Sequence, residues 1–127
     1  MLEDTDFTGS FCYPTCAAYE RYKELYQELL LRKGGDSNIG PKLPGLLHRA
    51  GIQRIELNVI QPAHDHGEGK LMAPFTMSRI SNALTAEGLA TEEEVQQILT
   101  ELNHVAGDSE TVISLPRIFQ VWGKRAI

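Results

Sequence analysis

The stretch Ile52–Ile60, IQRIELNVI, decides the fold class of this 127-residue chain. Its second half alternates apolar with polar residues, which predicts a strand with one apolar face that ends before Pro62. A second strand pattern covers Thr111–Trp122 and contains Pro116, which implies a bulge or an unpaired position there. We expect these two strands to pair antiparallel around the residues that separate them.

Helical periodicity fills most of the remaining chain. The predicted helices cover Ala17–Lys33, Pro41–Ala50, Thr76–Gly88 and a segment that opens at Thr91 and ends at Gly107. The last helix begins with a capping box, in which Glu94 follows Thr91 by three residues. Residues 62–75 are expected to form a loop, and residues 1–7 the tail of a strand with the loop beyond it. This order predicts an α/β fold of about three strands, the last two antiparallel, with four helices, as in the closing third of an open α/β sheet.

Length and composition restrict the possible classes of protein. A chain of 127 residues suits a single domain or a partial domain over residues 1–127. Twelve Lys and Arg against 17 Asp and Glu give a net charge of −5, so we expect no nucleic-acid partner. The sequence has neither an apolar run of transmembrane length nor the pattern of a signal peptide, so we expect no membrane partner. Two cysteines are too few for a disulfide framework, and a cytoplasmic location is the simplest expectation.

Two groups of residues resemble metal or thiol sites. The segment His64–His66, with Glu68 close by, supplies two imidazoles and carboxylates that could hold a metal. It lies in a Gly-rich segment without a further ligand at regular spacing, so a solvated loop is the preferred interpretation and no metal is expected. Cys12 and Cys16 are four residues apart, unlike a Cys-x-x-Cys pair, and packed thiols are favoured over a redox site.

Carboxylates gather near the first strand end. Glu3, Asp4 and Asp6 lie there, and ligands of open α/β sheets bind outside the carboxyl ends of strands. Asp4 and Asp6 are therefore plausible pocket residues, with a solvated acidic terminus as the alternative. Asn38 could also face a ligand, although its glycine-containing turn lacks the spacing of a phosphate loop. No catalytic triad and no paired general acid and base is evident, so no catalytic residue is assigned. Core packing is favoured over a substrate cage for a stripe of three tyrosines, Tyr19, Tyr22 and Tyr26.

Several blocks of the sequence, in order, resemble the C-terminal half of class I S-adenosylmethionine-dependent methyltransferases of the small-molecule type. The blocks are Glu3–Gly9, Tyr13-Pro14, Gly34–Pro44, Leu46–Ile52, the strand that ends at Gln61-Pro62, Gly67–Lys70 and Ser114–Arg117. Together they extend over nearly the full chain. The individual motifs are of moderate specificity, because this half of the family is the more variable one.

The resemblance implies a sheet of seven strands whose last strand is antiparallel. Residues 2–5 would then end the fifth strand, Arg54–Ile60 would form the sixth and Thr111–Trp122 the seventh, with a helical insertion at about 63–108. The substrate pocket would lie beyond the fifth strand. The resemblance gives five candidate substrate-pocket residues, namely Asp6, Phe7, Tyr13, Asn38 and Gly40.

The chain also departs from that family. Its members bind the cofactor through a Gly-rich loop after the first strand and an acidic residue at the end of the second, and neither lies in this chain. No cofactor-binding residue is carried over, so S-adenosylmethionine is expected in the parent enzyme and not on this chain alone.

The function expected from these observations is that of the C-terminal part of an S-adenosylmethionine-dependent methyltransferase acting on a small molecule, inactive as this chain alone. The alternative is a freestanding dimerisation or interaction module derived from that fold. The expected partner is a second copy of the chain or the missing N-terminal half. A metal-dependent hydrolase that uses His64 and His66 is a third, more distant hypothesis.

Overall fold

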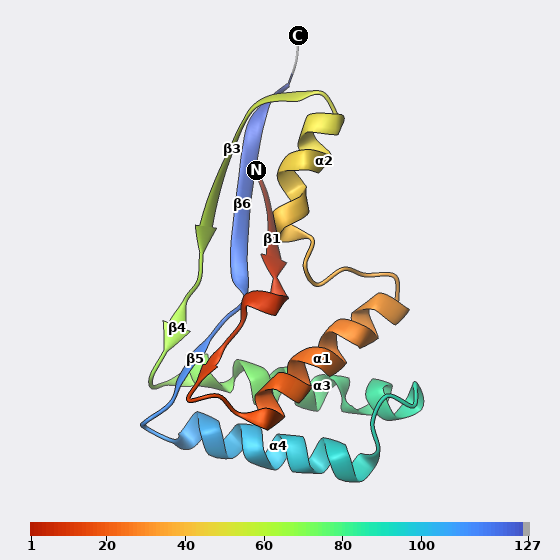
Figure 1. The fold of residues 1–127 in the computed structure, drawn as a ribbon, viewed down its shortest axis with the longest axis vertical. Coiled ribbons are helices and arrows are strands. Elements are labelled where there is room, and N and C mark those ends of the chain that lie inside the picture. Colours follow the sequence, from red (N-terminus) through yellow and green to blue (C-terminus); the bar gives the residue numbers. More distant parts are fainter. Residues whose placement is uncertain (126–127) are drawn as a thin grey trace.

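The computed structural model describes residues 1–125, and over that range the chain forms an α/β fold with four α-helices and two three-stranded antiparallel sheets. The larger sheet contains β1 (Leu2–Asp6), β3 (Ile52–Ile60) and β6 (Arg117–Arg125), in the order β1-β6-β3. Because β6 pairs antiparallel with both neighbours, β1 and β3 run in the same direction (Figure 1). The predicted antiparallel pairing of the two long strands, β3 and β6, is confirmed.

One face of the larger sheet is covered by a short helix. The helix α2 (Leu43–Arg49) follows a 3₁₀ turn at Gly40–Lys42 and packs beside β3 and β6 (Figure 1). Val121, in the middle of the sheet, is completely buried, and Leu43 of α2 is buried as well. The predicted helix Pro41–Ala50 is therefore confirmed in place, although its first turn is a 3₁₀ turn.

Pro116 divides the region that the sequence predicts as one strand. β5 (Val112–Ser114) ends before Leu115, and β6 begins at Arg117. Proline has no N–H to donate to a sheet ladder, which is why the pairing stops there. The expectation of a single strand over Thr111–Trp122 is thus wrong, whereas the unpaired position at Pro116 is confirmed. β5 instead joins a smaller sheet with β2 (Cys12–Tyr13) and β4 (Ala63–His64), in the order β2-β5-β4.

Three longer helices form the second part of the molecule, below the larger sheet in Figure 1. They are α1 (Ala17–Arg32), α3 (Met72–Ala86) and α4 (Glu92–Gly107). Thr91 is the N-cap as predicted, because its hydroxyl accepts a hydrogen bond from the Glu94 N–H at 3.1 Å, and the Glu94 carboxylate pairs with Arg21 at 3.3 Å. Apolar side chains of the three helices form the main core, which contains Tyr19, Tyr22, Leu25, Leu29, Met77, Leu84, Val95, Ile98 and Leu102.

The segment 62–75 is more ordered than its composition suggests. It holds β4, a 3₁₀ turn at Glu68–Leu71 and the start of α3 at Met72, so the expectation of a loop is wrong. Pro74 lies within the first turn of α3, where the absence of a backbone N–H costs no helical hydrogen bond. None of the helices within residues 1–125 is long and apolar enough to cross a membrane.

Candidate functional site

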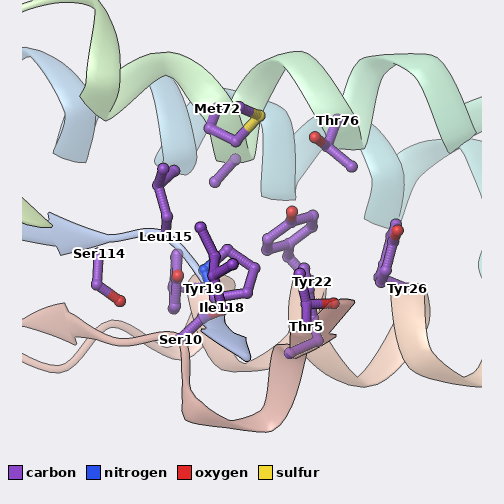
Figure 2. A pocket seen from close by; sticks show the side chains of 13 residues that line it. Thr5, Ser10, Tyr19, Tyr22, Tyr26, Met72, Thr76, Ser114, Leu115 and Ile118 are labelled. Carbon is purple, nitrogen blue, oxygen red and sulfur yellow. The ribbon is translucent and has the colours of Figure 1, made fainter. Parts of the chain in front are cut away.

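A cavity of about 250 Å³ lies between α1, α3 and the chain segments at the end of β1 and between β5 and β6 (Figure 2). It is therefore next to the carboxyl end of β1, the edge at which open α/β sheets bind ligands. The cavity is lined by Thr5, Phe7, Ser10, Tyr19, Tyr22, Tyr26, Met72, Ala73, Thr76, Ser114, Leu115, Pro116 and Ile118.

The tyrosine stripe of α1 forms one wall of this cavity. Helical spacing of three and four residues places Tyr19, Tyr22 and Tyr26 on the same side of α1. Tyr19 and Tyr22 are buried in the core, as the sequence favours, and they line the cavity as well. Figure 2 shows the hydroxyls of Tyr22 and Tyr26 directed toward α3, which contributes Met72 and Thr76.

Phe7 completes an aromatic group with two of these tyrosines. It lies in a 3₁₀ turn (Phe7–Gly9) directly after β1, and its side chain is buried. Its ring stacks on that of Tyr26 at a centroid distance of 4.3 Å and meets the ring of Tyr22 edge-on at 5.9 Å. Such pairs stabilise the packing by about 0.5–1.5 kcal/mol each beyond the burial of their area. The first turn after β1 is thereby fixed against α1.

Hydroxyl groups supply the polar part of the cavity wall. The Thr5 hydroxyl donates to the Ser37 carbonyl at 3.3 Å, and the Ser114 hydroxyl accepts from the Phe11 N–H at 2.8 Å. Ser10 differs from both, because its Oγ is buried and has no hydrogen-bond partner in the described part of the chain. Most buried hydroxyls are hydrogen-bonded, so an unpartnered one at a cavity wall is notable.

The cavity wall carries no formal charge. No carboxylate, imidazole, ammonium or guanidinium group is found among the described residues that line it. Two charged groups nearby are engaged elsewhere: Lys23 donates to the carbonyls of Thr8 and Ser10, at 3.0 and 2.6 Å, and Asp6 pairs with Arg117 at 3.3 Å. The site is therefore suited to a neutral ligand.

The phenols of Tyr19 and Tyr22 act as donors and not as bases. Burial raises the pKa of Tyr19 far above its ordinary value, and burial also raises the pKa of Tyr22 in the same way. Both phenols therefore stay protonated at neutral pH. They can donate hydrogen bonds to a ligand, but they cannot take up a proton from one.

The five pocket candidates of the sequence lie in different places. Phe7 lines the cavity, whereas Tyr13 is 69 % exposed and does not. Asp6 is held by its ion pair with Arg117. Asn38 donates to the Gln27 side chain at 2.9 Å and accepts from the Thr8 N–H at 2.8 Å. The last candidate is Gly40.

Gly40 supports the sheet from outside the cavity. A Cβ atom at this position would lie 2.9 Å from the Thr5 carbonyl oxygen and 2.9 Å from the ring of Phe119. Glycine therefore lets the turn before α2 approach β1 and β6 closely. Of the five candidates, only Phe7 belongs to the cavity wall.

The remaining acidic residues near the first strand also lie outside the cavity. Glu3 accepts a hydrogen bond from the Gln120 side chain at 2.9 Å, across the β1–β6 pair. Asp4 accepts from the N–H of the following residue, Thr5, at 2.8 Å. These carboxylates cap and bridge the strand without facing the aromatic group.

The histidine segment shows no metal geometry. Within residues 1–125, no group of three or more His, Cys, Asp or Glu side chains is placed to hold a metal ion. His66 contacts the carboxylate of Asp65, and this hydrogen bond lowers the pKa of Asp65 below its ordinary value. His64 lies closely against Gly69, where an added Cβ would be 2.3 Å from the imidazole.

The two cysteines are free thiols in different environments. Cys12 is buried in β2, and its Sγ lies 3.6 Å from the Pro14 carbonyl oxygen. Burial raises the pKa of the Cys12 thiol, so it stays protonated at neutral pH. Cys16 is half-buried at the start of α1.

The sequence did not identify most of the residues of the cavity wall. Ser10, Met72 and Thr76 carry no motif, because their role depends on how α3 packs against α1. Two signals are present in the sequence, because the blocks Glu3–Gly9 and Ser114–Arg117, which carry part of the resemblance, supply two and three residues of the wall. No protein-family model and no curated protein matches this chain.

Proposed function

We propose that this chain is the C-terminal part of a class I S-adenosylmethionine-dependent methyltransferase acting on a small molecule, and that the cavity receives the methyl acceptor. The observation that carries the proposal is the position of the cavity at the carboxyl end of β1, beside an aromatic wall. Beyond this strand the resemblance expects the substrate pocket.

The strand directions support the same proposal. The resemblance expects the fifth and sixth strands to be parallel to each other and the last strand to be antiparallel. β1 and β3 run in one direction, and β6 runs against both. The helices α3 and α4 lie between β3 and β6 in the chain, where the resemblance expects an insertion, and α3 contributes a wall of the cavity.

The described residues do not fit the cofactor itself. S-adenosylmethionine carries a carboxylate, an amine and a sulfonium, and the cavity wall offers no charged group to any of them. We therefore derive no step through the cofactor from this chain. In the proposal its site lies in a further part of the enzyme, which would continue the sheet at the edge of β1 that is unpaired within residues 1–125.

The role left to this chain is to hold the acceptor. Methyl transfer depends on alignment of the two reactants and on exclusion of water. The stacked aromatic rings and the apolar side chains of Met72 and Ile118 favour an ordered position for a flat molecule. The protonated phenols leave the acceptor without a base from this wall.

Titration with S-adenosylhomocysteine tests the proposal. The chain of 127 residues, shown to be folded by a cooperative urea transition, is expected to bind it more weakly than micromolar. The polypeptide translated from the complete reading frame that contains these residues is expected to bind it with a micromolar Kd and to transfer methyl groups. Binding of micromolar strength by the chain alone contradicts the proposal, and so does a complete reading frame that adds no cofactor half.

The second candidate function is a freestanding interaction module derived from the same fold. It is favoured by the unpaired edges of the larger sheet, where Leu2 and Leu57 are 45 % and 51 % exposed. In this case the partner is a second copy of the chain. The two candidates differ in what adds to the edge of β1, the rest of an enzyme or an identical chain.

A further inference from the structure

The chemistry of the cavity wall restricts what can bind there. A buried charge without a partner costs several kcal/mol, and the described wall has no group that could pair with one. A carboxylate, phosphate or ammonium in the ligand would therefore be strongly disfavoured. An uncharged molecule meets no such penalty.

The size of the cavity sets a second limit. A protein cavity of about 150 Å³ is large enough to bind benzene. The volume here, about 250 Å³, exceeds that by roughly the room for a second fused ring or a few substituents. The stacked and edge-on rings of Phe7, Tyr26 and Tyr22 present the flat surfaces that favour an aromatic guest.

Ser10 supplies a specific polar contact. The residue is 3 % exposed, its Oγ makes no hydrogen bond of normal geometry in the described part of the chain, and the Tyr19 phenol lies close enough to interact with it. A buried hydroxyl without a partner is costly, so a polar ligand atom that bonds to it gains affinity. Lys23 donates a hydrogen bond to the Ser10 carbonyl at 2.6 Å, which fixes the backbone that carries this hydroxyl.

We propose that the cavity binds an uncharged aromatic molecule of one or two fused rings that carries a hydroxyl or carbonyl group, and that Ser10 and Tyr19 bond to that group. The inference rests on the proposed function in one respect: it names the chemical class of the methyl acceptor. The binding itself requires neither the cofactor nor turnover.

Three probes of equal ring size test the inference: naphthalen-2-ol, naphthalene and naphthalene-2-carboxylate. Each is titrated at pH 7 into the chain labelled with ¹³C at the methionine methyl groups. Met72 lines the cavity, whereas exposed Met1 and Met77, which is completely buried in the core, serve as internal controls. Naphthalen-2-ol is expected to shift the Met72 resonance and to bind at least tenfold more tightly than the carboxylate.

Variants separate the polar contact from general apolar binding. Ser10→Ala is expected to weaken the binding of naphthalen-2-ol by about three- to tenfold and to leave the affinity for naphthalene unchanged. Ser78→Ala, on the exposed side of α3, is the matched control and is expected to alter neither probe. An unchanged Met77 resonance shows that a variant is folded, and Tyr19→Phe provides a second test if Ser10→Ala fails this criterion.

Two results would overturn the inference. One is binding of the carboxylate as tight as that of naphthalen-2-ol, and the other is a Met72 resonance that no probe moves. Since no cofactor is present in these titrations, a failure of methyl transfer in the complete enzyme leaves their outcome intact. Conversely, an active enzyme whose methyl acceptor is charged would contradict this inference but agree with the proposed function.

Discussion

Lys70 has an unusual environment for a lysine. The residue is 1 % exposed, and its ammonium donates to three backbone carbonyls, those of Asp65 at 3.2 Å, Asp108 at 2.7 Å and Thr111 at 2.9 Å. An ammonium has three donors, so every one of them is used. The bonds join the segment before α3 to the end of α4 and the approach to β5. A single side chain thus fixes the helices relative to the small sheet.

Lys70→Met is therefore expected to destabilise the fold strongly. Methionine fills a similar volume but removes the donor to the Asp65 and Thr111 carbonyls, while the Asp108 carbonyl keeps the N–H and hydroxyl of Thr111. We expect a loss of about 3 kcal/mol in the free energy of unfolding. Urea denaturation measures this loss. Lys33→Met is the control, because the exposed Lys33 makes only a 4.0 Å ion pair and should change stability by less than about 1 kcal/mol. Equal effects of the two substitutions would contradict this role of Lys70.

At the scale of elements, α1 couples the core to the cavity. Its buried tyrosines belong to the hydrophobic core through their rings and to the cavity through the wall that they form. Because burial raises the pKa of Tyr19 and Tyr22, these phenols remain protonated in the folded chain at a pH where they ionise in the unfolded chain. The stability of α1 and its neighbours should therefore depend on pH in alkaline solution.

The sign of this dependence follows from linkage. Both phenols contribute fully to the free energy of unfolding below their unfolded pKa of about 10. This contribution is lost as the pH rises from there toward the higher pKa of the folded chain. Each tyrosine is expected to lower the free energy of unfolding by about 1.4 kcal/mol per pH unit in that window. Urea titrations between pH 8 and 11 measure the slope. The double variant Tyr19→Phe, Tyr22→Phe should flatten it, whereas Tyr13→Phe, at an exposed position, should not.

Local patterns in the sequence predict much of this fold. The alternation in Ile52–Ile60 and the capping box at Thr91 depend on neighbouring residues alone, and both elements form where they are predicted. The division at Pro116 and the early start of α3 depend on tertiary pairing, because each partner lies far away in the chain. Hence the pattern predicts one continuous strand and a loop where the structure has two strands and the start of a helix.

The candidate site is less accessible to sequence analysis than the fold. Phe7 is predictable as a residue that follows a strand end, where ligands of such sheets bind. Ser10 is different, since a serine in a loop has no pattern that distinguishes a buried hydroxyl from a solvated one. Its burial arises from the packing of α1 and of the segment around Ser114. The resemblance likewise selects Gly40, which supports the sheet but does not line the cavity.

At the scale of the whole molecule, the larger sheet has two unpaired edges within residues 1–125. β1 forms one edge and β3 the other, with β6 between them. Unpaired edges with exposed apolar residues tend to recruit further strands. Both candidate functions use this property, one to continue an enzyme's sheet and one to join two copies of the chain.

Sedimentation velocity over a hundredfold concentration range tests whether the unpaired edges join two copies of the chain. The chain alone is expected to associate into dimers, because Leu2 and Leu57 remain exposed at the sheet edges otherwise. Leu2→Lys places a charge on β1 and should weaken association at least tenfold. Leu31→Lys, at an exposed site on α1, should have no such effect. A monomer at every concentration would contradict this prediction.

The position of β6 in the sheet also has a consequence for the order of events during synthesis. Both β1 and β3 pair with β6, and the hydrogen bond between Glu3 and Gln120 joins residues 117 positions apart. At a translation rate of about 5–20 residues per second, β1 waits on the order of ten seconds for its partner. The helical core can assemble earlier, since its contacts are closer along the chain. The last residues to join the cavity wall are therefore Leu115, Pro116 and Ile118. In the nascent chain, the aromatic side chains of the wall are already in place when these residues are added.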